Sequence, residues 1–62
     1  MTPEIAVLKM LLDALAKANQ AVSLWINEFP ADAHIATGTA MFLLSEALKK
    51  MEAIHASEEA KP

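Results

Sequence analysis

The sequence predicts an all-α fold, an antiparallel two-helix hairpin that self-associates into a four-helix bundle. Apolar residues recur at steps of three and four along two long segments, and prolines and acidic residues separate those segments. The chain has 62 residues, of which 55% are hydrophobic and 21% charged, with a formal charge of −3. This balance is typical of one small folded domain rather than a disordered chain.

The first helix is expected over about residues 3–28. Thr2 can cap the free backbone N–H groups, Pro3 suits the first helical position, and Glu4 meets the positive end of the helix dipole. The apolar positions then follow the a/d spacing of a heptad repeat. This first seam consists of Ile5, Leu8, Leu12, Leu15, Asn19, Val22 and Ile26, with Phe29 continuing it.

A turn over residues 29–32 is expected next, because Pro30 cannot continue a helix and keeps Phe29 out of the helical region. Asp32 then serves as the N-cap of a second helix, over about residues 33–56. A second seam follows at the same steps: His34, Thr37, Met41, Leu44, Leu48, Met51 and His55.

The tail, residues 57–62, is expected to fray, because Glu58 and Glu59 lie at the negative end of the dipole. Gly38, inside the second helix, is expected to cost about 1 kcal/mol relative to alanine. Glu46 is expected to support Lys49 and Lys50 on a solvated face.

The surplus of large apolar residues predicts self-association, with a homodimer as the simplest assembly. Two seams over about 50 helical residues offer only about 14 inward positions, fewer than the large apolar residues of the chain. Asn19 is interpreted as a buried amide that fixes register and oligomeric state. The expected oligomer core is Ile5, Leu8, Leu12, Leu15, Asn19, Val22, Ile26, Met41, Leu44, Leu48 and Met51.

Composition also limits compartment and partners. The absence of cysteine fits a reducing compartment, so we expect a cytoplasmic protein. The uninterrupted apolar stretches fall short of the ~20 residues that a bilayer requires, so no membrane span is expected. All the basic residues are lysine, which counts against nucleic acid as the main partner.

We expect neither catalysis nor a cofactor or metal site. His34 and His55 stand roughly 31 Å apart along one helix, too far to share a metal ion. The serines have no base at the spacing of a nucleophile and its partner, and no carboxylates are paired for acid–base chemistry.

Two binding surfaces are candidates. Apolar residues outside the seams, or near the turn, form a candidate partner surface: Trp25, Phe29, Ile35 and Phe42. The small residues 36–40 permit close helix approach, and a small ligand, such as a nucleotide, is the alternative occupant of a gap there. The candidate ligand gap is Asn19, Thr37, Gly38 and Thr39.

The outline resembles the Rop type of plasmid RNA-binding protein, whose hairpins dimerise into a four-helix bundle. The resemblance covers the architecture and the acidic turn Asn27-Glu28-Phe29-Pro30-Ala31-Asp32, and no residue of that family's RNA-binding face carries over. It implies a Rop-like RNA-binding bundle. Small hairpin proteins of phages and plasmids, which bind a host protein or a signalling nucleotide, are similar in size. The residues favour a homo-oligomeric, protein-binding regulator or inhibitor, with a small-molecule-sequestering oligomer as the alternative.

Overall fold

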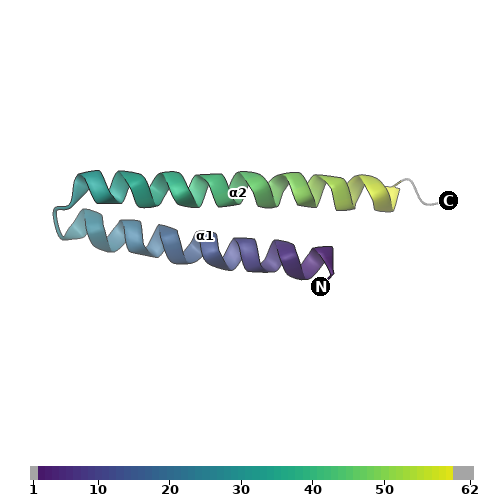
Figure 1. Ribbon diagram of the computed structural model, residues 1–62, viewed down its shortest axis with the longest axis horizontal. Coiled ribbons are helices and arrows are strands. Elements are labelled where there is room, and N and C mark those ends of the chain that lie inside the picture. Colours follow the sequence, from purple (N-terminus) through teal and green to yellow (C-terminus); the bar gives the residue numbers. More distant parts are fainter. Residues whose placement is uncertain (1, 60–62) are drawn as a thin grey trace.

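The computed structural model describes residues 2–59 as two helices, α1 (Pro3–Ile26) and α2 (Pro30–Glu59). The helices run antiparallel side by side, joined by a short turn (Figure 1). The predicted all-helical hairpin is therefore confirmed. Neither described helix is long and apolar enough to cross a membrane.

The predicted cap at the start of α1 is confirmed. The side-chain oxygen of Thr2 accepts a hydrogen bond from the backbone N–H of Ile5 at 3.2 Å. Pro3 occupies the first helical position and Glu4 lies in the first turn. This arrangement satisfies one of the N–H groups that a helix leaves without an internal partner.

The end of α1 is a Schellman turn built on a residue other than glycine. The helix stops at Ile26, two residues before the predicted end at 28. The N–H of Glu28 donates to the carbonyl of Trp25 at 3.2 Å, and the N–H of Phe29 donates to that of Leu24 at 2.8 Å. This pair of bonds requires a left-handed residue directly after the C-cap, which is Asn27. Glu28 occupies that position and adopts φ 66°. A non-glycine residue in this conformation costs about 1–2 kcal/mol.

The second helix begins at Pro30, so the predicted start at residue 33 is wrong. The fixed φ of proline suits the first helical position, where its missing N–H costs nothing. The carbonyl of Phe29 accepts the first helical bond, from the N–H of Ala33 at 2.9 Å. Asp32 therefore lies in the first turn of α2 instead of capping it.

The end of α2 also differs from the predicted boundary. The helix continues to Glu59, beyond the predicted end at 56. The predicted fraying of the tail concerns residues 57–62, of which 57–59 are helical and 60–62 lie outside the described residues.

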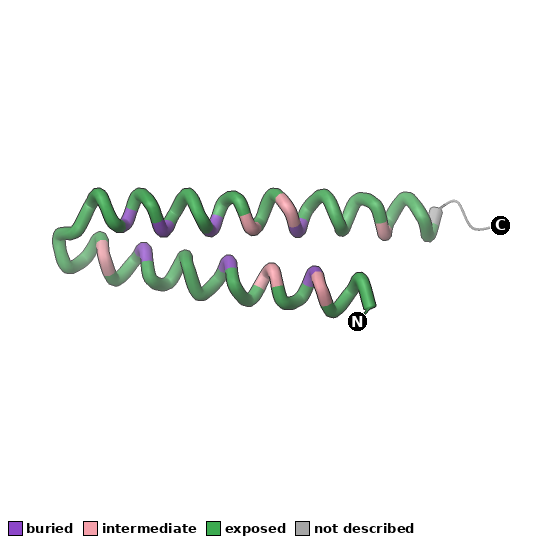
Figure 2. Tube along the Cα trace, in the orientation of Figure 1, coloured by how far each residue is buried: buried purple, intermediate pink, exposed green. Residues whose placement is uncertain are grey.

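Small side chains form the contact between the helices. The most enclosed are Ala47 and Ala14, which are 1% and 2% exposed. Buried residues on the two helices face one another across the hairpin (Figure 2). We call this set the alanine line: Val7, Ala14, Ala21, Ala33, Ala36, Ala40 and Ala47. Among the described residues, no large side chain is fully buried.

The hairpin is consequently long and thin, with more surface than its mass requires. Its radius of gyration is 14.8 Å, whereas a compact domain of this length has about 10.6 Å. Its accessible surface is 4830 Å², against about 3,900 Å² for a compact protein of this mass. One chain therefore buries too little apolar surface to make a core of large residues.

Candidate interaction surface

An open hollow of about 660 Å³ lies on one face of the hairpin, beside the turn. Its floor belongs to the alanine line, and larger side chains from both helices form its walls. Floor residues are Ala21, Ala33 and Ala40; wall residues include Val22, Trp25, Ile26, His34, Met41 and Leu44. The lining is almost wholly apolar, so the hollow suits an apolar occupant.

The hollow is one end of a longer apolar face. Seven-residue steps keep a helix position on the same side, so the rows through Ile26 and Val22 continue to Leu12 and Leu15. On α2, Leu48 follows Leu44 by four residues and therefore lies on the same side of the helix. We call the following set the apolar face: Ile5, Leu8, Leu11, Leu12, Leu15, Ala18, Asn19, Val22, Trp25, Ile26, His34, Thr37, Met41, Leu44, Leu48 and Met51.

The residues predicted as the oligomer core all lie on this face. The structure leaves their large apolar members exposed, from 37% for Met51 to 71% for Ile26. The two seams do not meet each other within the chain, because the alanine line beside them occupies the contact between the helices. Burial of the seams thus requires something outside the described hairpin.

The opposite side of the hairpin combines charged and apolar residues, and we call it the mixed face. A smaller depression of about 310 Å³ on it is lined by Lys17, Asp32 and Ile35, among others. Further along α2, the Nζ atom of Lys49 lies 3.6 Å from Oε1 of Glu46, one of the two pairs predicted around Glu46. Charged side chains therefore line the mixed face, whereas the middle of the apolar face has none.

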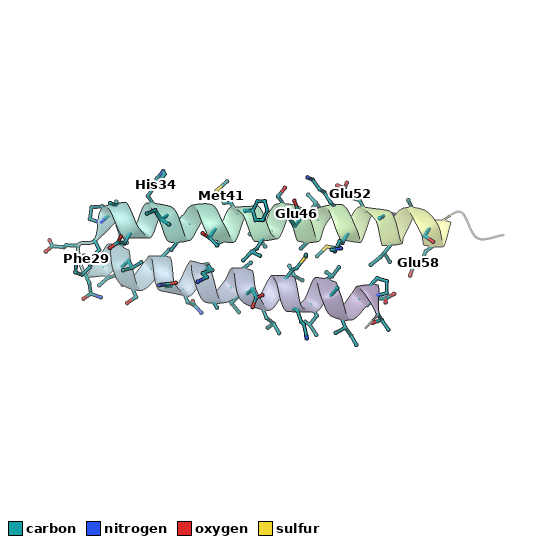
Figure 3. The ribbon with its side chains drawn as sticks, in the orientation of Figure 1. Phe29, His34, Met41, Glu46, Glu52 and Glu58 are labelled. Atoms are coloured by element: carbon teal, nitrogen blue, oxygen red, sulfur yellow. The ribbon has the colours of Figure 1, made fainter. Side chains whose placement is uncertain are left out.

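The candidate partner residues are divided between these faces. Trp25 is 68% exposed and lines the hollow, and Phe29 lies at the turn (Figure 3). Ile35 and Phe42, 66% and 64% exposed, lie seven residues apart on the mixed face. The structure therefore separates Trp25, which lines the hollow, from Ile35 and Phe42 on the mixed face, and leaves Phe29 at the turn.

The candidate ligand gap is also divided. Thr37 lines the hollow, but its hydroxyl donates to the carbonyl of Ala33 at 2.8 Å. Thr39 lies in the mixed-face depression, and its hydroxyl donates to the carbonyl of Ile35 at 3.1 Å. A side chain at Gly38 would meet nothing within 4 Å.

Asn19 lies on the apolar face and is exposed, but it is not among the residues that line the hollow. The four gap residues therefore do not converge on one cavity. The structure leaves the amide of Asn19 on the same face as the first seam.

Titratable residues lie near the ends of the apolar face. His34 lines the hollow beside the turn. At the open end, Glu4, His55 and Glu58 line a depression of about 250 Å³ with Met51. Across residues 2–59, no three His, Asp or Glu residues form a group that could hold a metal ion.

Sequence reasoning missed the role of the alanine line as the floor of the hollow. Its signal was present in the seven-residue spacing of Val7, Ala14 and Ala21.

Fold and surface together define a helical hairpin held by small residues, with one broad apolar face open. Comparison with known protein families, curated proteins and solved structures finds no significant match to this chain.

Proposed function

We propose that this protein is a small, non-catalytic regulator or inhibitor that acts by binding another protein as a homo-oligomer of helical hairpins. The observation that carries the proposal is the exposure of the seams: Leu12, Leu15 and Leu48 are each between 55% and 57% exposed, while small residues hold the hairpin. Large apolar residues placed on one continuous face mark an interaction site.

The size of the apolar face supports self-association as a dimer in a four-helix bundle. Fully burying a large apolar side chain removes about 60–120 Å² at about 25 cal/mol per Å². About ten such residues that are half exposed would remove about 300–600 Å² per copy, or about 600–1,200 Å² for two copies. A standard interface of about 1,200–2,000 Å² that is about 60% apolar needs a comparable apolar area.

The mixed face supports binding of a second, different protein. It stays exposed when two apolar faces meet, and it presents Ile35 and Phe42 among charged residues. Apolar anchors inside a polar rim are the usual anatomy of a protein-binding surface. The proposed division of labour is therefore an apolar face for a second copy and a mixed face for the target.

Native mass spectrometry of protein purified gently from cells tests the proposed assembly. We expect a whole multiple of the 6.7 kDa chain, with two copies as the main species and no added mass. A single-copy species at micromolar concentration contradicts it. For the target, binding that Ile35→Asp or Phe42→Asp abolishes without changing the oligomer would support the mixed face, and loss of binding with neither variant would contradict it.

The hollow supports a second candidate function, sequestration of a small molecule by the oligomer. Its volume of about 660 Å³ lies within the range of about 300–1,000 Å³ found for ligand pockets. A reproducible extra mass of about a few hundred daltons per chain or per interface, with a ligand-dependent rise in melting temperature, would favour this candidate. Its loss in a Trp25→Ala variant would place the ligand in the hollow.

A further inference from the structure

We propose that the second copy lies on the apolar face in an antiparallel orientation, with the turn of each hairpin over the open end of the other. This inference rests on the self-association proposed above and adds its geometry. It follows from an asymmetry along the apolar face, whose half beside the turn differs from its open-end half in both side-chain volume and charge.

Side-chain volume differs first. The turn half contains the hollow of about 660 Å³, with Ala18, Ala21 and Thr37 in its lining. The open-end half carries large residues in the same rows, namely Leu8, Leu11, Leu12, Leu48 and Met51. Protein interiors are filled to the density of organic crystals. An antiparallel copy brings bulky side chains over the hollow, whereas a parallel copy brings hollow over hollow.

Charge differs in the same direction. At the open end, two carboxylates, of Glu4 and Glu58, and one imidazole, of His55, line the depression that borders the apolar face. At the other end, His34 is the titratable residue in the lining of the hollow. Like charges brought together across an interface are strongly unfavourable. A parallel dimer would gather Glu4 and Glu58 of both copies at one end, and an antiparallel dimer separates them.

The chain has no cysteine, so single cysteines can report which positions meet. The test uses a bismaleimide cross-linker with a span of about 10 Å and three single variants, Leu15→Cys, His34→Cys and Glu4→Cys. Leu15 lies near the middle of the apolar face, and the other two positions lie towards its ends. In an antiparallel dimer, two His34 positions are about 25 Å apart and two Glu4 positions about 34 Å apart along the axis.

We expect Leu15→Cys to cross-link with a second copy of itself. His34→Cys alone and Glu4→Cys alone should form no cross-linked dimer. A mixture of these two variants should form the dimer that joins one chain of each. Self-linking of His34→Cys with no unlike pair in the mixture overturns the antiparallel orientation while leaving the dimer intact. Absence of cross-linking by every variant, including Leu15→Cys, overturns self-association itself.

A second pair guards against a variant that fails to fold. Ile5→Cys and Ile26→Cys lie in one row of α1, near opposite ends of the face, and each keeps an apolar side chain. The same pattern is expected: an unlike pair in the mixture and little self-linking. Exposed Gln20→Cys, which lies in the depression on the mixed face, measures cross-linking by random collision, and helical circular dichroism establishes that each variant is folded. Signals equal to that of Gln20→Cys count as no contact.

Discussion

Met41 and Phe42 are neighbours in α2 whose side chains leave the helix about 100° apart, and they give a sharp test of the face that is proposed to bind a second copy. Met41 is 66% exposed and lines the hollow, whereas Phe42 is 64% exposed and follows Ile35 by seven residues on the mixed face. Aspartate at either position meets solvent in the isolated hairpin. Met41→Asp should therefore dissociate the dimer and Phe42→Asp should not.

The magnitude follows from the exposed fraction of Met41. Full burial of methionine is worth about 1.5–3 kcal/mol, so covering the exposed two thirds is worth about 1–2 kcal/mol per copy. A symmetric dimer loses this twice, about 2–4 kcal/mol, which weakens the dimer about 30- to 1,000-fold. Enclosing a carboxylate among apolar side chains weakens it further.

Sedimentation equilibrium over a range of concentrations measures both dissociation constants, and circular dichroism reports the helicity of each variant. We expect the constant for Phe42→Asp to stay within about threefold of the parent. Equal dissociation by Phe42→Asp and Met41→Asp, or an unchanged dimer with Met41→Asp, would show that the apolar face does not bind the second copy.

Four further substitutions, one of them with a control variant, test individual elements. Glu28→Gly should raise the free energy of unfolding by about 1 kcal/mol, because glycine relieves the left-handed conformation; a chemical denaturation curve showing no gain would contradict this strain. Gly38→Ala should also stabilise by about 1 kcal/mol, since its new Cβ meets nothing within 4 Å, and a fall in melting temperature would show that something covers this position. Ala47→Leu should destabilise by about 1–3 kcal/mol by forcing the helices apart, while exposed Ala16→Leu stays within about 0.5 kcal/mol; equal denaturation midpoints would disprove close helix contact. Asn19→Leu should give a more stable protein with mixed oligomeric states in native mass spectrometry, and a large loss of stability would count against a register-setting amide.

The hairpin could be predicted because heptad spacing and a helix-breaking proline are local signals. The start of α1 followed from Thr2, Pro3 and Glu4, whose effects act within one turn. The start of α2 did not, because Asp32 and Pro30 both favour a helix start and the sequence does not rank them. The structure starts at Pro30, with the carbonyl of Phe29 accepting the first bond.

Which stripe faces the other helix could not be read from periodicity. The alanine line through Ala14 and Ala47 repeats with the same heptad period as the seams of large residues. Periodicity identifies stripes, and only three-dimensional packing decides which of them the second helix covers. The residues of the candidate ligand gap do not form a common cavity. The hydroxyls of Thr37 and Thr39 instead donate hydrogen bonds to backbone carbonyls of their own helix.

The described hairpin lacks a core of large residues, and we propose that a second copy supplies it. Thermal unfolding followed by circular dichroism at chain concentrations spanning about a hundredfold tests it most directly, because association stabilises the folded state by mass action. We expect a melting temperature that rises steadily with concentration. A fully helical protein whose melting temperature is the same at every concentration, and which sediments as one chain throughout, would contradict it.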